Sequence, residues 1–385
     1  MDLQTKIIEA IEKKHFSCCI FLDFAKAFDT VDHEILLKKL EYYGIRGIAL
    51  EWFHSYLKGR KQSVVVGGEM SETLNINYGV PQGSVLGPLL FLIYINDIPL
   101  SSKVFDFHLF ADDTSLFMSN ANLENLELEA NMELANISDW LIANKLSLNT
   151  KKSNFLVTTP GHKKSRNIKI CINNEEIAES NSVKYLGVLI DNNLNWKPHI
   201  QQTKLKIAKS IGVLSRLRHL ASKEILVSIY NAFIQPHLNY GIINWGGTYT
   251  SILEPLRKVM KHAVRLITFQ PRTAHSQPLF KKLRILCFDN CYRLERAKFM
   301  HDINNNMLGK QFCDLFLLTK CKHNMNTRQA TSGLFSQPAL RTNSKKNSII
   351  NNGVKIWNDI PLDIRQFKSK INFKKKYRLW LLAKY

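Results

Sequence analysis

The chain has 385 residues, of which 45% are hydrophobic and 22% charged, so it can bury a large core in two or three domains. Its longest apolar run, Val85–Ile95, is too short to span a bilayer, and no basic segment with a cleavage site begins the chain; we expect neither a membrane span nor a signal peptide. Seven cysteines without regular spacing predict reduced thiols and an intracellular protein.

The net charge of +21 is unevenly distributed along the chain. Residues 1–150 carry 12 Lys and Arg against 20 Asp and Glu, whereas residues 151–385 carry 41 against 12. A strongly basic half is typical of a protein that binds a polyanion, and we expect that polyanion to be nucleic acid. The acidic half is the part of the chain in which cations would be concentrated.

The first 80 residues alternate between helical and extended patterns. An amphipathic helix is expected over residues 2–14, followed by a buried strand, Ser17–Phe24, that carries Asp23 near its end. Two helices follow, one beginning at Asp32 and one ending near Leu57. Two strands, 62–66 and 73–77, are then expected around Gly67-Gly68.

The next stretch contains a Gly/Pro loop, an apolar helix and a hairpin. The loop is Tyr78–Gly87, and the helix over residues 88–95 carries no charge, so we expect the core to surround it. The hairpin joins residues 104–110 to 114–118 through Ala111-Asp112-Asp113. Two carboxylates about 4 Å apart repel by roughly 4 kcal/mol at an effective dielectric of 20, and a divalent cation removes that cost. Taken alone, the pair favours the simpler interpretation, a solvated Asp-Asp turn, and only the rest of the chain favours a cation site.

The remaining chain changes from mixed to helical patterns. We expect a long helix over Leu123–Asn144, with Met132 among its apolar positions, a loop passing into a strand over 146–157, a basic connection over 158–167, and short strands over 168–190. Helices are expected over 199–220, 223–235, 252–269 and 279–308, then a loose polar segment near 309–350 and a basic final helix.

Transfer of a phosphoryl group to a hydroxyl is catalysed by two metal ions about 3.5–4 Å apart, which clamp the attacking and leaving oxygens. Magnesium takes carboxylate and phosphate oxygens and keeps several waters, so the protein has to supply only two or three rigidly held aspartates. A strand end with Asp23 beside a hairpin tip with Asp112 and Asp113 would supply them.

Five stretches in a fixed order carry a resemblance to reverse transcriptases of non-long-terminal-repeat retrotransposons, the jockey-like group in particular. They match the family's motifs A to E, and the final WNDIP (Trp357–Pro361) resembles that group's C-terminal tail. The five are FLDFAKAFD (21–29), GVPQGSVLGPLLF (79–91), FADD (110–113), LSLNTKKS (146–153) and VKYLG (183–187).

The resemblance implies an α+β fold: a right-hand polymerase palm, with an antiparallel sheet and packed helices, followed by a mostly helical basic thumb and C-terminal region. It implies an RNA-directed DNA polymerase that adds deoxynucleoside triphosphates to a DNA primer on an RNA template with two Mg²⁺, Mn²⁺ being an alternative. Asp23 and Asp112 would be the principal metal ligands, with Asp113 a supporting carboxylate and the carbonyl of Phe24 facing a metal.

Further roles follow from the same resemblance, each beside a plainer alternative. Phe28 matches the aromatic steric gate that rejects a ribose 2′-hydroxyl, or it is an ordinary core aromatic. Lys152 matches the lysine that protonates the leaving pyrophosphate, although Lys151 is a rival and an exposed lysine pair the alternative. Pro81, Gln82 and Gly83 match the nucleotide-facing loop, for which a plain turn is the alternative. Tyr185, Leu186 and Gly187 match the primer grip, for which a short core strand is the alternative.

We expect palm with partial fingers over 1–165, the motif E hairpin and thumb over 166–270, and a helical basic region over 271–385. The family places fingers motifs and an endonuclease before motif A, yet only some twenty residues precede Asp23, so we expect an N-terminally truncated polymerase in the nucleus or cytoplasm. The alternative is a catalytically impaired nucleic-acid-binding remnant; a maturase or telomerase-like enzyme fits the motifs less well. Spacing favours free cysteines over zinc at Cys287, Cys291, Cys313, Cys321 and His323.

Overall fold

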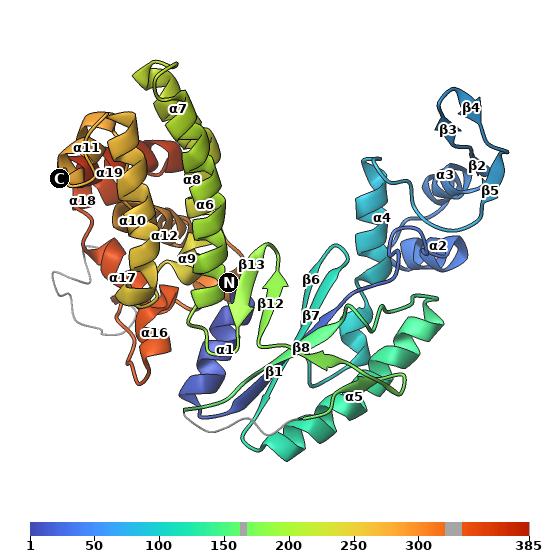
Figure 1. The fold of residues 1–385 in the computed structure, drawn as a ribbon. Helices are drawn as coiled ribbons and strands as arrows, with labels where there is room; N and C mark the ends of the chain where they lie inside the picture. Colours follow the sequence, from blue (N-terminus) through green and yellow to red (C-terminus); the bar gives the residue numbers. More distant parts are fainter. Residues whose placement is uncertain (162–167, 320–332, 385) are drawn as a thin grey trace. The chain divides into compact units, whose positions relative to one another are not determined.

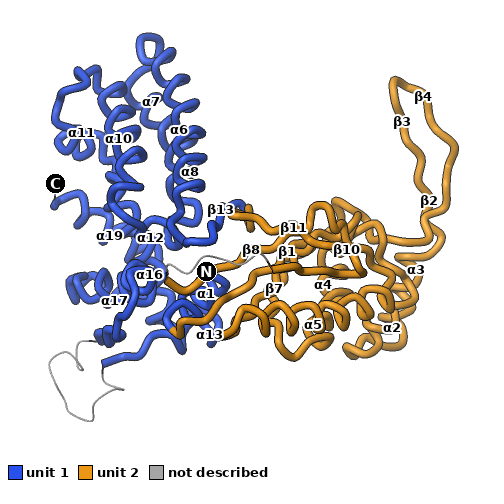
Figure 2. The backbone as a smooth tube through the Cα atoms, turned by 60° about the horizontal axis from the view of Figure 1, so that its bottom comes forward, with its two compact units in different colours: residues 1–12, 187–385 blue, residues 13–186 orange. Residues whose placement is uncertain are grey.

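The computed structural model describes residues 1–161, 168–319 and 333–384. The chain forms two compact units: residues 13–186 make up one, and residues 1–12 together with 187–385 make up the other (Figures 1 and 2). The predicted functional limits at residues 165 and 270 stay predictions. Each unit is described by itself below.

A five-stranded sheet in the order β11–β8–β1–β7–β6 forms the centre of the first unit. All seven residues of its middle strand, β1, are buried, and all but Ser17 are apolar, as expected for a strand in the core. The strand pairs antiparallel with β7 on one side and β8 on the other, β6 continues the antiparallel pairing, and β11 joins β8 in parallel. The strands are β1 (Phe16–Leu22), β6 (Asp106–Phe110), β7 (Asp113–Asn120), β8 (Asn154–Thr158) and β11 (Ala178–Glu179).

Helices cover this sheet and bury its apolar side chains. The longest, α5, packs against β1 and β7 (Figure 1), and its buried face includes Leu126, Leu134 and Leu141. Helix α2 packs against both α3 and α4. The helices are α2 (His33–Tyr42), α3 (Ile48–Leu57), α4 (Leu86–Ile95), the short 3₁₀ helix η1 (Ile98–Ser101) and α5 (Leu123–Ala143).

Short two-stranded ribbons complete the unit. The predicted strands on either side of Gly67-Gly68 form two successive pairs rather than one, β2 with β5 and β3 with β4. The strands are β2 (Arg60–Gln62), β3 (Val65–Val66), β4 (Glu69–Met70), β5 (Leu74–Ile76), β9 (Cys171–Ile172), β10 (Glu175–Glu176) and β12 (Ser182–Tyr185).

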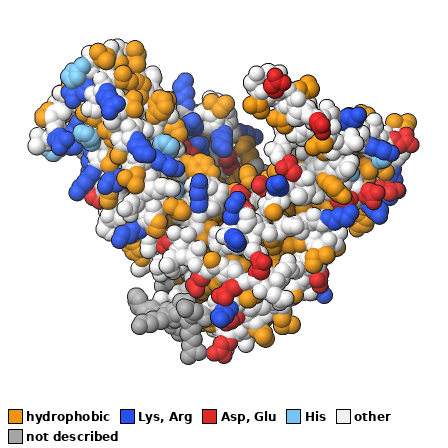
Figure 3. All heavy atoms as spheres, turned by 45° about the vertical axis from the view of Figure 1, so that its right-hand side comes forward, with side chains coloured by type: hydrophobic (Ala, Val, Ile, Leu, Met, Phe, Trp, Pro, Cys, Tyr) orange, Lys and Arg blue, Asp and Glu red, His pale blue; other side chains and the backbone are white. Residues whose placement is uncertain are grey.

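The second unit is mostly helical and basic. Helix α6 packs against α7 and α10, while α12 packs against α17 and α19; Figure 3 shows Lys and Arg side chains on this unit. Its elements are α1 (Asp2–Glu12), β13 (Val188–Asp191), α6 (Lys197–Leu217), α7 (Lys223–Phe233), α8 (Gln235–Asn239), α9 (Ile242–Trp245), α10 (Thr250–Ile267), α11 (Ser276–Leu283), α12 (Phe288–Asn304), α13 (Lys310–Cys313), α16 (Asn343–Asn347), α17 (Ile349–Asn358), α18 (Leu362–Arg365) and α19 (Lys370–Ala383). The predicted α+β class is confirmed.

Several sequence-based expectations were wrong in detail. The apolar helix α4 is covered on one face only, since Leu89 and Leu92 are exposed, and Met132 of α5 also points to solvent. The helix expected over 279–308 is two helices, because Arg284 adopts a left-handed conformation (φ 54°) that ends α11. The segment expected to be loose, 309–350, includes α13 and α16 and the start of α17.

Some expectations fall on parts of the chain that are not described. The basic connection includes residues 162–167, and the zinc alternative includes Cys321 and His323; both lie outside the described residues. The six cysteines that are described are free thiols. Within residues 1–161, 168–319 and 333–384, no helix is long and apolar enough to cross a membrane.

Candidate active site

The aspartates singled out in the sequence lie at the ends of neighbouring strands. Asp23 follows β1 directly, and Asp113 opens β7, whose register sets Leu22 opposite Thr114. Continued by one residue, this register sets Asp23 across from Asp113. Asp112 occupies the turn between β6 and β7, next to Ala111, whose backbone is left-handed (φ 53°). The predicted hairpin therefore exists, and it brings its two carboxylates to the end of β1.

The carboxylates of Asp23 and Asp112 repel that of Asp113. Burial raises the pKa of the Asp113 carboxyl, and the negative charges of Asp112 and Asp23 raise it further. Like charges on directly opposed positions of an antiparallel pair are unfavourable. The site thus holds more negative charge than its own surroundings neutralise, which favours binding of a cation.

A cavity of about 510 Å³ joins the end of β1 to the Gly/Pro loop. Asp23 and Asp112 both line it, and so do the ring of Phe28 and the side chain of Gln82. Phe28 is half-buried, with its ring centroid 4.7 Å from that of Phe91, so one side of the ring is packed while the residue still lines the cavity. The lining residues are Asp23, Phe24, Lys26, Ala27, Phe28, Pro81, Gln82, Gly83, Pro88, Asp112 and Lys152.

A turn of residues 147–153 holds Asp23 from the side opposite the hairpin. The backbone N–H of Asp23 donates to Ser153 Oγ at 3.1 Å, and its carbonyl accepts from Asn149 N–H at 2.7 Å. The same turn brings Lys152 to the cavity lining, whereas Lys151 lies outside it; both lysines are exposed. Of the two lysines that the sequence left as rivals, Lys152 is the one beside the carboxylates.

The loop that carries Gln82 is fixed to the segment that follows Asp23. Gly79 N–H donates to Val31 O and Val80 N–H donates to Phe28 O, both at 2.8 Å. Gly79 has a φ of 87°, and a Cβ there would lie 2.9 Å from the Asp29 backbone, so only glycine fits this approach. Backbone hydrogen bonds therefore join the two segments that carry Phe28 and Gln82, and both residues line the same cavity.

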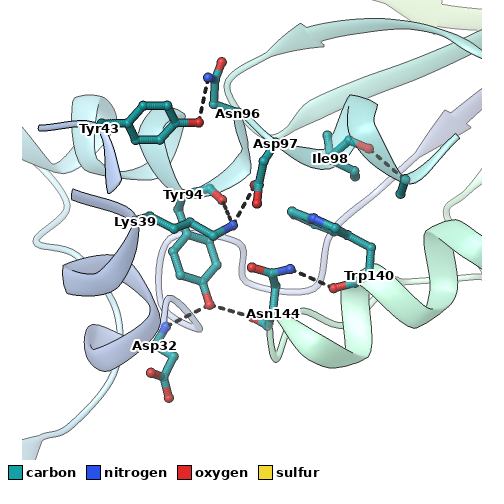
Figure 4. A network of polar contacts seen from close by, with 10 residues as sticks. Asp32, Lys39, Tyr43, Tyr94, Asn96, Asp97, Ile98, Trp140 and Asn144 are labelled. Carbon is teal, nitrogen blue, oxygen red and sulfur yellow. Dashed lines mark hydrogen bonds and ion pairs between the residues drawn. The ribbon is translucent and has the colours of Figure 1, made fainter. Parts of the chain in front are cut away.

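A buried polar network locks α2, α4 and α5 together behind this site (Figure 4). The fully buried Tyr94 hydroxyl donates to Asn144 O at 2.6 Å and lies 3.4 Å from the Asp32 N–H. Lys39 Nζ lies 2.6 Å from both Asp97 Oδ1 and Tyr94 O, and 4.9 Å from the ring centroids of Tyr94 and Trp140. Burial raises the pKa of Tyr94 to about 12, so its hydroxyl stays a donor at neutral pH.

Three residues of the site were missed by sequence reasoning. Lys26 lines the cavity, Ser153 supports Asp23, and Asp29 Oδ1 accepts a 2.8 Å hydrogen bond from Gln82 Nε2. All three lie inside stretches that were already singled out, so position in the motif was a usable signal. What the sequence did not contain was the direction in which each side chain points.

The positions of the predicted primer-grip residues indicate less about their role. The Tyr185 ring packs on Phe21 of β1, with ring centroids 5.4 Å apart. Leu186 has a left-handed backbone (φ 45°) and is the last residue of the first unit, while Gly187 is the first of the second. These three residues lie outside the lining of the carboxylate cavity, and their role stays a prediction.

The donor chemistry of the cavity fits a magnesium ion. Magnesium is bound by one or two carboxylates together with water and phosphate oxygens, and Asp23 and Asp112 supply the carboxylates. Asp113 is not part of the lining. Across the residues that the structure describes, no three His, Cys, Asp or Glu side chains form a group that could hold a metal ion. The cavity therefore offers a magnesium ion two carboxylates, those of Asp23 and Asp112, while Asp113 lies outside the lining.

Comparison with known proteins gives a consistent result. Residues 3–190 match the sequence profile of the family described as reverse transcriptase (RNA-dependent DNA polymerase). A probable RNA-directed DNA polymerase from the transposon X-element of Drosophila melanogaster is 31% identical over 279 residues, 68% of this chain and 29% of that protein. The RNA-directed DNA polymerase from the mobile element jockey of Drosophila funebris is 28% identical over 280 residues, 69% of this chain and 30% of that protein.

The chain thus spans less than a third of the length of either relative. Among solved structures, telomerase from Candida albicans in complex with a fragment of telomeric RNA matches 77% of this chain and 50% of its own. Its sequence identity to this chain is 13% and its TM-score is 0.32.

Proposed function

In residues 3–190 this chain belongs to the reverse transcriptase family, with jockey-like retrotransposon polymerases among its relatives, and on that basis we propose that it is an RNA-directed DNA polymerase. The observation that carries the proposal is that Asp23, Asp112 and Lys152 line one cavity together with Phe28 and Gln82. Strand β1, the hairpin, the 147–153 turn and the Gly/Pro loop each contribute to it.

The proposed reaction transfers a nucleotide to a primer end. The primer 3′-hydroxyl loses its proton to solvent water, its oxygen forms a bond to the α-phosphorus of a deoxynucleoside triphosphate, and the bond from that phosphorus to the bridging oxygen of pyrophosphate breaks. Asp23, Asp112 and the Phe24 carbonyl would hold two magnesium ions, with Asp113 as a supporting carboxylate; these ions would supply charge neutralisation at the attacking and leaving oxygens. Lys152 Nζ would donate a proton to the departing pyrophosphate.

The other lining residues would select and orient the substrate. The Phe28 ring would lie beneath the sugar and exclude a 2′-hydroxyl by contact. Gln82 would present its amide to the nucleotide pair, since an amide both donates and accepts hydrogen bonds. Tyr185, Leu186 and Gly187 would support the primer end, and exposed lysines of α6 such as Lys204, Lys206 and Lys209 would contact phosphates of the RNA–DNA duplex.

Single-nucleotide extension of oligo(dT) on poly(rA) with magnesium tests the proposal. We expect extension by the wild-type chain, and a loss of at least about a hundredfold in Asp112→Asn, the scale on which removing a transition-state-stabilising group acts. The matched control is Asp139→Asn, an exposed aspartate of α5, which should extend normally. If the wild-type chain binds the primer–template yet extends no better than Asp112→Asn, the second candidate holds: a nucleic-acid-binding protein without catalysis.

A further inference from the structure

A separate cavity of about 160 Å³ lies wholly within the helical second unit. It is formed where α12 packs against α8 and α19, and the last turn of α7 and the link between α11 and α12 complete its wall. A cavity of about 150 Å³ can hold a molecule the size of benzene, so this one accommodates a single small group rather than a whole nucleotide. The lining residues are Asn231, Gln235, Asn239, Ile285, Leu286, Cys291, Leu294, Glu295, Lys374 and Arg378.

Two cations on one face of α19 line this cavity. Lys374 and Arg378 are four residues apart, the spacing at which like charges on a helix repel each other. Arg378 donates one hydrogen bond, from Nη2 to Arg284 O at 2.9 Å, which leaves most of its five N–H donors for another partner. Among the described residues, neither cation forms an ion pair with a carboxylate. An anion bound between them would therefore remove their repulsion.

The lining also holds a carboxylate and a thiol, and neither cancels these positive charges. Glu295 lines the cavity, but Lys298 Nζ lies 2.6 Å from its Oε2 and neutralises it. Burial raises the pKa of the Cys291 thiol to about 12, so this group is uncharged at neutral pH. The cavity therefore retains the two positive charges of Lys374 and Arg378.

The amide side chains of the lining supply uncharged donors. Gln235 Nε2 donates to Asn239 Oδ1 at 2.8 Å, so the NH2 group of Asn239 is the end left for another partner. Gln235 Nε2 also donates to Cys291 Sγ at 3.3 Å, which holds this pair of amides against α12. Asn231 is exposed and makes no side-chain hydrogen bond within the described part of the chain. Cations combined with such donors suit a phosphate group, because its oxygens accept several hydrogen bonds.

We propose that this cavity binds a phosphate dianion, either free inorganic phosphate or the terminal phosphate monoester of a nucleic-acid strand. The charges agree, because a phosphate monoester carries about −1.5 to −2 at pH 7 and a backbone phosphodiester only one negative charge. Lys374 and Arg378 bind its oxygens, and Asn239 donates a hydrogen bond from its NH2 group. The site lies in the unit that does not carry Asp23 and Asp112, and its ligand takes part in no reaction, so the inference is independent of the proposed polymerase activity.

Isothermal titration calorimetry of the full chain, in EDTA and at physiological salt, tests the site with three ligands. They are inorganic phosphate, the 5′-phosphorylated dinucleotide pTpT, and TpT, whose single phosphate is a diester. We expect inorganic phosphate and pTpT each to bind in one equivalent and at least about tenfold more tightly than TpT, the scale of one hydrogen bond to a charged group. Binding of pTpT identifies a strand end as a source of the phosphate, whereas binding of inorganic phosphate alone identifies the free anion. Binding of neither, or TpT binding as tightly as both, would overturn the proposal.

Variants locate the bound phosphate. Lys374→Gln removes an exposed cation that has no partner in residues 1–161, 168–319 and 333–384, so the fold should be unaffected and affinity should fall by at least about tenfold. Asn231→Leu, which removes an uncharged donor, should weaken binding by about threefold. The matched control is Lys375→Gln, the next residue, which is also exposed but lies outside the lining; its affinity should stay within about twofold, because salt screens indirect charges. Wild-type affinity in Lys374→Gln, or an equal loss in Lys375→Gln, would place the phosphate elsewhere and refute the site.

Discussion

Replacing Tyr94 with phenylalanine tests how far the buried network stabilises the unit that carries the carboxylates. The substitution keeps the ring and removes only the hydroxyl, which is fully buried and donates to Asn144 O at 2.6 Å. The Asn144 carbonyl then loses this partner in a region that excludes water, at a cost of about 1–3 kcal/mol. For a unit of this size, such a loss lowers the melting temperature by about 2–12 °C.

Hydrogen exchange of peptides from α2 and α5, read by mass spectrometry, measures this loss within the unit itself. We expect faster exchange where the network joins the two helices, at Asp32 and Asn144, together with a lower urea midpoint. Tyr42→Phe is the matched control: Tyr42 is 86% exposed, so its change should stay within about 0.5 kcal/mol. If the two variants behave alike, the hydroxyl contributes nothing and the reasoning from burial is wrong.

Three further predictions follow from individual contacts. Gly79→Ala should lower stability by about 2 kcal/mol or more, because its Cβ would meet the Asp29 backbone at 2.9 Å; Gly83→Ala has a similar φ but open space, and should cost about 1 kcal/mol, both read from urea midpoints. Burial, reinforced by the charge of Lys206, lowers the pKa of His199 to about 4. The His199 imidazole therefore stays neutral in the folded chain, whereas in the unfolded chain it gains a proton below about pH 6.5. The second unit should therefore lose about 3 kcal/mol as pH falls from 6.5 to 4, and His199→Gln should flatten that profile. Phe28→Val should raise ribonucleotide incorporation relative to deoxynucleotide by about tenfold or more in single-nucleotide extension, and an unchanged ratio would leave Phe28 as a core aromatic.

The sequence predicted most of the carboxylate site because local patterns determine it. A buried apolar strand ending in Asp23 and a β-patterned hairpin with Asp112 at its turn are each recognisable within about ten residues. Strand pairing then leaves few ways to arrange them. The 147–153 turn, which lies within the stretch LSLNTKKS, brings Lys152 to the cavity that Asp112 also lines.

The directions of side chains and their exposure to solvent could not be predicted from local sequence patterns. Periodicity marks Leu89, Leu92 and Met132 as apolar, but what covers an apolar position depends on distant parts of the chain, and all three are exposed. The Gln82–Asp29 hydrogen bond joins residues 53 apart in sequence. It exists because Gly79 allows one loop to approach another, a contact that no pattern within either loop contains.

The two principal aspartates are held to different degrees, and the difference bears on how the site would bind a cation. Asp23 follows a strand paired on both sides, and its own backbone N–H and C=O are bonded to Ser153 and Asn149. Asp112 lies in a turn at the end of a hairpin, beside a residue with left-handed backbone. Such a turn can adjust by small backbone rotations, whereas the end of β1 cannot move without breaking sheet pairing. Burial raises the pKa of the Asp113 carboxyl first, and the charges of Asp112 and Asp23 raise it further; a cation held by Asp23 and Asp112 would offset this charge contribution.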